Sequence, residues 1–145
     1  MRITVDSNVL VRAATSPQGP ALRLLDIILG SHTLVLSRFI LDEVERVLMY
    51  PRLRFRYGIT PAEAARFARA LGDVSHLVEP SIASPVVLSD PDDDAVLYTA
   101  LDGKADILCT LNTKHFGAYL VQSFCNRHGI RVMGDVETLR ELEKR

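Results

Sequence analysis

The chain opens with Arg2-Ile3-Thr4-Val5-Asp6-Ser7-Asn8-Val9-Leu10-Val11, a stretch that passes from a β-prone run into a run with helical spacing. Its first four residues predict a short strand that ends at Asp6, and the apolar positions from Val9 onward predict a helix. A strand that leads directly into a helix is the repeating unit of α/β proteins. The stretch therefore indicates an α/β fold, with Asp6 at the end of the first strand.

The same alternation continues along the chain. Further strands are predicted at residues 33–37, 105–111 and 130–133, and two short apolar pieces at 76–78 and 86–88 suit an edge strand or a connection. Helices are predicted between them, at residues 21–29, 40–48, 60–72, 90–101 and 113–116 and from 135 onward. Strands that alternate with helices imply a mainly parallel sheet covered on both faces. No repeat or linker interrupts the pattern, so we expect a single domain over residues 1–145.

The composition is that of an ordinary globular protein. Apolar residues make up 48% and charged residues 24% of the 145 residues. No apolar run approaches the roughly 18 residues that a membrane-spanning helix needs, and the charged start of the chain is unlike a secretory signal, so we expect a cytoplasmic protein without membrane association. Cys109 and Cys125 are expected to be reduced core residues, because neither the cysteines nor the histidines show the spacing of a metal site.

The charges are unevenly distributed although the net charge is only −1. Acidic residues crowd into the stretch 89–94, and basic residues gather at Arg52, Arg54 and Arg56. A pI near 6.4 argues against non-specific, charge-driven binding to nucleic acid. It does not exclude an enzyme that binds phosphates through cations.

Oxygen-bearing side chains follow several of the predicted strands. In open parallel sheets, ligands bind beyond the carboxyl ends of the strands. The sequence places there Asp6, Glu43 in the helix after the second strand, the run Asp90-Pro91-Asp92-Asp93-Asp94, and Thr110 with Asn112. Hard cations such as Mg²⁺ and Mn²⁺ prefer carboxylate and amide oxygens. The sequence thus predicts a site for divalent cations at this edge of the sheet.

Each candidate also suits a purely structural role. Asp6 and Asn112 both suit the N-cap of a helix, and so does Asp90, whose neighbouring acids would complement the helix dipole. Glu43 flanks the apolar stripe of its helix on one side and Glu45 flanks it on the other, so helical spacing does not choose between them.

Two features of the acidic run favour the cation site. Four aspartates between residues 90 and 94 repel one another at close range unless a cation intervenes. Asp93 shares a helix face with Val96, Leu97 and Ala100, so its carboxylate starts on the side that faces the protein. A charge turned inward needs a partner, and no lysine or arginine lies nearby in the sequence.

Four short motifs resemble, in order and spacing, those of the PIN domain family, and their similarity is greatest to the branch of toxin–antitoxin toxins related to VapC-type ribonucleases. They are the opening stretch 3–11, Leu41-Asp42-Glu43-Val44, Ser89-Asp90-Pro91-Asp92-Asp93-Asp94 and Ala105-Asp106-Ile107-Leu108-Cys109-Thr110. The resemblance covers the chain from Arg2 to about Thr113. It implies a three-layer α/β/α sandwich and Mg²⁺- or Mn²⁺-dependent endoribonuclease activity. It also implies a homodimer, and an antitoxin partner that blocks the site.

The resemblance also implies roles for particular residues. The family's first acid matches Asp6, with Asn8 and Thr110 in support, and its helical glutamate matches Glu43. Its third acid falls in the aspartate run, where Asp93 fits best, with Asp90 close by and Asp94 as a one-residue alternative. Together these acids would hold one cation, or two, that orient an attacking water on RNA. The family usually has an aspartate where this chain has Asn112, so the resemblance implies a weaker second cation.

Arg52, Arg54 and Arg56 alternate with Leu53, Phe55 and Tyr57 just after a predicted helix end. In an extended conformation the three arginines would share one side. They would then suit RNA phosphates, with the aromatic rings stacking on bases. The simpler alternative is a solvated or dimer-facing loop, since charge runs are commonly just solvated.

Two rival functions remain open. A phosphoacceptor receiver domain is also an α/β protein with clustered aspartates, but it needs adjacent acids after the first strand, where this chain has Ser7 and Asn8. A PIN-like domain with little or no catalysis, acting as a binding module, is the stronger rival because of Asn112.

Overall fold

The fold is built on five parallel strands. The structure, a computed structural model, describes residues 1–144. The strands are β1 (Arg2–Val5), β2 (Thr33–Ser37), β3 (His76–Val78), β4 (Ile107–Cys109) and β5 (Arg131–Met133), in the spatial order β3-β2-β1-β4-β5. Every neighbouring pair is parallel. The central strands β1, β2 and β4 are almost wholly buried, which explains why they are short continuous apolar runs rather than alternating ones.

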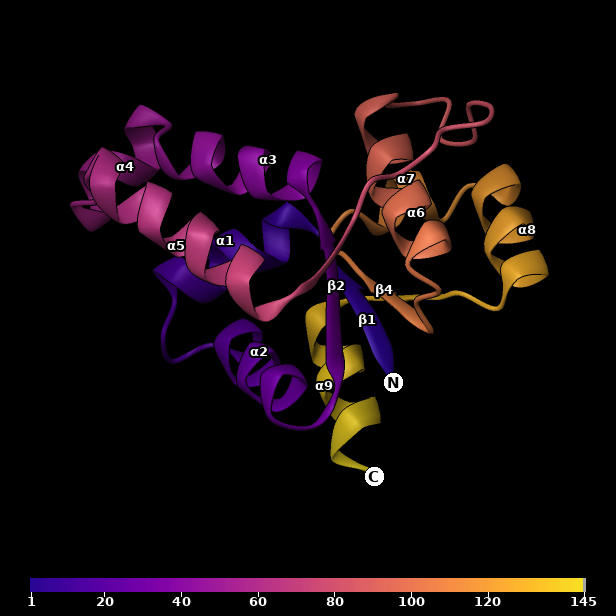
Figure 1. Cartoon of the computed structure of the whole chain (residues 1–145), viewed down its shortest axis with the longest axis horizontal. Coiled ribbons are helices and arrows are strands. Elements are labelled where there is room, and N and C mark those ends of the chain that lie inside the picture. The colour runs from indigo at the N-terminus through magenta and orange to yellow at the C-terminus, as the bar shows by residue number, and fades with distance from the viewer. Residues whose placement is uncertain (145) are drawn as a thin grey trace.

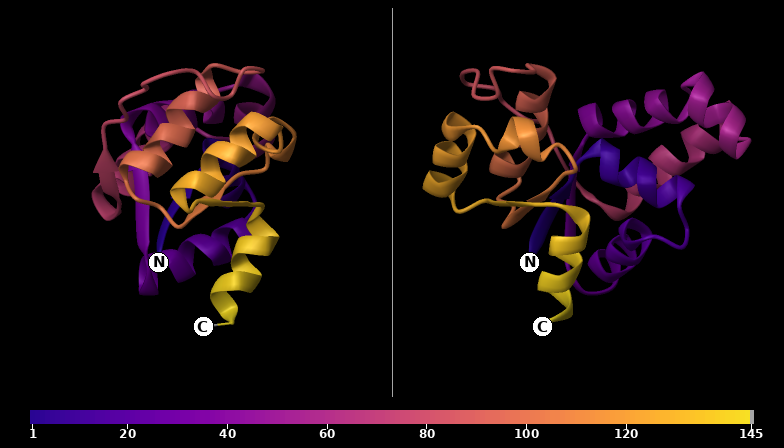
Figure 2. Two further views of the ribbon diagram at one scale, coloured as in Figure 1. Left: turned by 90° about the vertical axis from the view of Figure 1, so that its right-hand side faces the viewer. Right: turned by 180° about the vertical axis from the view of Figure 1, so that it is seen from behind.

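Helices connect the strands and cover both faces of the sheet. They are α1 (Ser7–Thr15), α2 (Pro20–Ser31), α3 (Arg38–Leu48), α4 (Pro51–Tyr57), α5 (Pro61–Val74), α6 (Asp92–Asp102), α7 (Thr113–Phe116), α8 (Tyr119–His128) and α9 (Asp135–Glu143). Figure 1 views the sheet nearly edge-on, with α1 to α5 on one side and α6, α7 and α8 on the other. Figure 2 shows the same separation from behind. The architecture is therefore the expected three-layer α/β/α sandwich.

The strand order creates a place where ligands bind in folds of this class. β1 pairs with β2 on one edge and with β4 on the other, so the chain leaves β1 in one direction and later returns to its opposite side. In open parallel sheets the crevice at such a reversal, beyond the carboxyl ends of the strands, is the usual binding site. Val5 and Cys109 are register partners at the ends of β1 and β4, which puts the residues that follow them side by side.

Several predicted boundaries were wrong. The stretch 51–57 is the helix α4 and not an extended segment, because Pro51 begins a new helix as well as ending α3. The strand predicted at 105–111 is limited to Ile107–Cys109, and the helix predicted from 90 begins at Asp92. The final helix begins at Asp135 as expected, but its N-cap is Gly134, whereas the sequence had suggested Asp135 as the cap.

Other predictions were confirmed. The edge strand at 76–78 is present, while 86–88 is a connection, and Cys109 and Cys125 are free and buried. Within residues 1–144, none of the helices has the length and hydropathy to cross a membrane.

Candidate metal centre

Asp6 lies at the carboxyl end of β1 and uses its two oxygens differently. Its Oδ1 accepts from the backbone N–H of Ser7 at 2.7 Å and so caps α1. Its Oδ2 accepts from the Thr110 hydroxyl at 2.8 Å, across the β1–β4 junction. Burial raises the pKa of Asp6 to about 6, against these two hydrogen bonds, and the charges of Asp93 and Glu43 raise it further. Both charges that act on Asp6 are thus negative.

Glu43 approaches Asp6 from α3. The Ser7 hydroxyl donates to Glu43 Oε1, and Arg46 lies 3.5 Å from Oε2. Because Ser7 directly follows Asp6, this contact brings the α3 carboxylate beside the end of β1.

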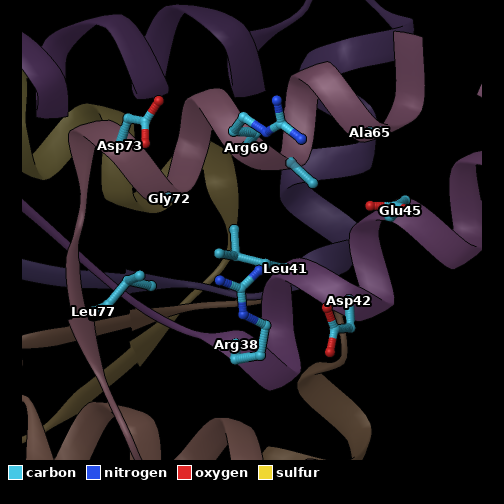
Figure 3. A pocket seen from close by; sticks show the side chains of 10 residues that line it. Arg38, Leu41, Asp42, Glu45, Ala65, Arg69, Gly72, Asp73 and Leu77 are labelled. Atoms are coloured by element: carbon cyan, nitrogen blue, oxygen red, sulfur yellow. The ribbon is translucent and has the colours of Figure 1, made fainter. Parts of the chain in front are cut away.

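Glu45 is turned away from Asp6. With Asp42 it lines a pocket of about 360 Å³ between α3 and α5, shown in Figure 3, and Arg38 and Arg69 lie on the walls of the same pocket. The two acids that helical spacing left equivalent are therefore on different sides of α3.

Asp93 lies in the first turn of α6 and is buried, although it is charged. Its Oδ2 accepts from Asn112 Nδ2 at 3.0 Å, and His115 Nδ1 lies 2.9 Å from the same oxygen. Burial raises the pKa of Asp93, the hydrogen bond from His115 lowers it, and the charges of Asp90 and Glu43 raise it. The partner that an inward-facing charge needs is thus His115, which is distant in the sequence.

Asp94 has a different neighbourhood from Asp93. Its Oδ1 accepts from the backbone N–H groups of Val86 and Val87 at 2.8 and 2.9 Å, so it fastens the connection that precedes α6. Asp90 accepts from the backbone N–H of Asp92 and lies near Asp93. Within the described residues, Asp90, Asp93 and His115 offer ligand atoms that all lie within 4.8 Å of one another.

Asn8 and Thr110 hold the backbone around these carboxylates. Asn8 Oδ1 accepts from the backbone N–H of Leu111 at 3.2 Å. The Thr110 hydroxyl accepts from the backbone N–H of Asn112 at 3.0 Å while it donates to Asp6. Both side chains therefore fix the path of the chain after β4, and with it the position of Asn112.

The donor set fits a divalent cation. Asp6, Glu43 and Asp93 come from three separate segments. The charges of Glu43 and Asp93 raise the pKa of Asp6, and the charge of Glu43 also raises the pKa of Asp93. Carboxylate oxygens crowded in this way repel each other, and a hard cation replaces the repulsion with attraction. The carboxylates suit Mg²⁺ and Mn²⁺, and the imidazole of His115 adds a ligand type that suits softer divalent ions such as zinc.

The three arginines predicted to contact RNA are not part of this cluster. They lie on α4, which Figure 1 shows at the far end of α3 from α6. Arg52 and Arg56 are four residues apart and share a helix face, whereas Arg54 points to the opposite side, so the prediction that all three share one side was wrong.

Sequence reasoning missed Ser7 and His115. Ser7 had a signal in its position directly after Asp6, at the start of a helix. His115 had a weaker one: it follows Asn112 by three residues on the predicted short helix, which puts the two side chains on one face. The spacing of His115 from the other histidines is not that of a zinc site, so that pattern does not identify it.

A comparison with known families agrees with this geometry. The sequence profile of the PIN domain matches residues 2–114, which is most of the chain and includes all the acids described above. No curated protein gives a match. The PIN domain is a nuclease-type fold whose members typically bind divalent metals. The chain therefore belongs to the PIN domain family.

Proposed function

We propose that this chain is a divalent-metal-dependent endoribonuclease, with a single catalytic domain over residues 1–145 whose centre is formed by Asp6, Glu43 and Asp93. One observation carries the proposal: carboxylates from β1, α3 and α6 lie close enough at the reversal point of a parallel sheet for the charges of Glu43 and Asp93 to raise the pKa of Asp6, and burial raises the pKa of both Asp6 and Asp93. Buried carboxylates among like charges are costly, and a bound cation would offset that cost.

The chemistry follows from the side chains. A bound Mg²⁺ or Mn²⁺ supplies a Lewis acid that lowers the pKa of an attacking water and offsets negative charge on the phosphate. Asp6, Glu43 and Asp93 would hold the cation, and Asp90 and His115, whose ligand atoms lie within 4.8 Å of that of Asp93, would extend the set on one side. Thr110 and Ser7 hold Asp6 and Glu43 in place through their hydroxyl groups.

The test is cleavage of a mixed set of single-stranded RNAs by purified protein with Mg²⁺, with Mn²⁺ and with chelator. Asp6→Asn and Asp93→Asn should each lower metal-dependent cleavage by at least about 100-fold, since direct ligands matter more than outer-shell partners. Glu45→Gln, which removes a charge on the other side of α3, is the matched control and should retain activity. Full activity in a clean preparation of Asp6→Asn would overturn the proposal.

A binding module with weak catalysis is the second candidate, and Asn112 favours it. Its amide donates to Asp93 Oδ2 and occupies an oxygen that a cation would need. Asn112→Asp distinguishes the two functions: it should raise cleavage in an active nuclease limited by its metal affinity. A folded protein that binds RNA, but cleaves none with either residue at position 112, would be the binding module.

We propose that the chain acts biologically as a toxin of the VapC type, because its four sequence motifs resemble those of that branch. The expected partners are an antitoxin protein that covers the metal centre and a second copy of the chain. Co-expression with the product of a neighbouring reading frame should relieve growth arrest if the role is correct, and growth unaffected by the active chain alone would contradict it.

A further inference from the structure

Helix α4 carries a group of cations that the metal centre does not use. Arg52, Arg54 and Arg56 are exposed, and among residues 1–144 no carboxylate lies within ion-pair distance of any of them. The guanidinium of Arg54 lies 5.6 Å from the centre of the Phe55 ring, and that of Arg56 lies 5.5 Å from the centre of the Tyr57 ring. These charges are therefore available to a partner.

The helical geometry divides them between two faces. Arg52, Phe55 and Arg56 stand at positions i, i+3 and i+4 of α4 and so share one side of the helix; we call these three residues the α4 face. Leu53 packs against the hydrophobic core and fixes the helix, while Arg54 lies on the side opposite Arg52. Phe55 is 77% exposed, which is unusual for a phenylalanine held on a helix.

The charge around α4 is also locally strong. Residues 46–69 contain six of the 17 basic residues of the chain and a single acid, Glu63, although the whole chain has a net charge of −1. Glu63 is engaged with Thr60 in the capping box of α5. A positive region on an otherwise slightly acidic protein points to a negatively charged partner rather than to general solubility.

We propose that the α4 face is a binding site for single-stranded RNA outside the metal centre, with Arg52 and Arg56 on phosphates and Phe55 stacked on an unpaired base. Arginine pairs with phosphate through two parallel N–H groups, and exposed aromatic rings stack on bases that are not in a duplex. The inference rests on the proposed ribonuclease function for the identity of its partner.

The position of α4 fits a long substrate. Helix α3 follows β2 directly and leads away from the sheet to α4, as Figure 1 shows. From Glu43 to the end of α3 at Leu48 the helix advances five residues, or about 7.5 Å, and α4 begins beyond it at Pro51. We therefore expect a longer RNA, and not a dinucleotide, to reach both the metal centre and α4.

RNA binding without cleavage tests the proposal directly. The probe is a fluorescently labelled, unstructured RNA, titrated with metal-free protein in chelator at several salt concentrations. Arg52→Ala and Arg56→Ala should each weaken binding and reduce the slope of log K against log salt by about 0.7, the value for one phosphate contact on a single strand. Phe55→Ala should weaken binding by roughly 5- to 150-fold with an unchanged slope.

Arg127→Ala is the matched control, since it removes one exposed arginine from α8, on the other side of the sheet from α4. At moderate salt it should change binding much less than Arg52→Ala. Equal losses from all three arginine variants would show long-range attraction instead of a contact face, and would overturn the proposal. An unchanged affinity in every variant, or a shift from dimer to monomer with RNA binding intact, would overturn it as well.

The length of the substrate separates this inference from the nuclease itself. In an active enzyme, Arg52→Ala/Arg56→Ala should raise KM for a long RNA and leave cleavage of a dinucleotide unchanged. Arg127→Ala/Arg140→Ala removes two exposed charges on α8 and α9 and should leave both the KM for the long RNA and the cleavage of the dinucleotide unchanged. If no metal supports cleavage but the binding results hold, the nuclease proposal fails and the α4 face survives. Equal effects on both substrates would overturn the α4 face.

Discussion

Asp6 is a candidate for two roles, helix cap and cation ligand, and the sequence left both open. The structure shows the first, and the proposed function assigns the second to the same side chain. One oxygen caps α1 through Ser7, and the other faces Thr110 and the neighbouring acids. The cost of this position is an ionised carboxylate in a buried place among like charges.

Removing that charge should stabilise the metal-free protein. Because the pKa of Asp6 is about 6 in the folded state and 3.8 is its ordinary value, the folded protein holds this proton more tightly than the unfolded chain. The stability due to protonation is present at low pH and lost as the pH rises through about 6. Asp6→Asn should therefore raise the free energy of unfolding by about 2–3 kcal/mol at pH about 7.5.

The same substitution should give little or no gain at pH about 4, where Asp6 is protonated in the folded protein. Urea unfolding in chelator at the two pH values measures the difference. A gain that is equal at both would show that the Asp6 charge carries no burial penalty.

Asp93 and Asp94 should separate into a ligand and a structural residue. Asp94→Ala removes the acceptor for two backbone N–H groups and should lower the free energy of unfolding by about 2–4 kcal/mol, while metal affinity persists in the folded fraction. Asp93→Ala should abolish Mn²⁺ binding and change the free energy of unfolding less than Asp94→Ala does. Thermal unfolding with and without Mn²⁺ measures both.

Asp94→Asn keeps an oxygen for those N–H groups and serves as the folded control. If Asp94→Asn lost Mn²⁺ binding while Asp93→Asn retained it, the two assignments would have to be exchanged.

The residues of the candidate site differ in how far the sequence alone identifies them. Asp6 and the aspartate run could be found because they directly follow a strand or open a helix. The choice between Asp93 and Asp94 could not, since it depends on where the connection 86–87 folds back. The role of His115 could not be predicted either, because its contact with Asp93 joins residues 22 apart and depends on how the chain folds.

At the scale of elements, the helices that were missed had readable signals. In α8 the buried residues Val121, Phe124 and Cys125 stand at i, i+3 and i+4, a plain amphipathic pattern. In α4 the alternation of arginine with apolar residues imitates a strand, and only the proline at its first position and Gly58 just after it mark a helix. The strands were found more easily because apolar runs in parallel sheets are continuous.

The junction of α6 with the sheet should be sensitive to one added methyl group. A Cβ at Gly103 would collide with Val35 Cγ1 of β2 and lie 3.0 Å from the Thr99 carbonyl, so there is no room for a side chain between the end of α6 and Val35. Gly103→Ala should lower the free energy of unfolding by about 1–3 kcal/mol through overpacking.

Gly30→Ala is the matched control. It lies in α2 with nothing within 4 Å of the added Cβ, and alanine favours a helix over glycine by about 1 kcal/mol. Chemical denaturation of both variants gives the comparison. A neutral Gly103→Ala would show that β2 and α6 are less closely packed than the structure has them.

At the scale of the whole molecule, strand order is what assembles the site. The alternation of strands and helices predicted the α/β class, and the parallel sheet with helices on both faces follows from the same pattern. The order β3-β2-β1-β4-β5 has no such local signal, because it results from how the layers pack. Yet this order puts the ends of β1 and β4 side by side and brings α3 and α6 over them.

Calorimetric titration of metal-free protein with Mn²⁺ tests most directly whether these segments form one cation site. Wild-type protein should bind Mn²⁺, and Asp6→Asn, Glu43→Gln and Asp93→Asn, which change three different segments, should each weaken binding by more than about 10-fold. Glu45→Gln, on the far side of α3, should bind as the wild type does. Unchanged Mn²⁺ affinity in the three ligand variants, with their folds intact, would contradict a metal centre at the end of β1.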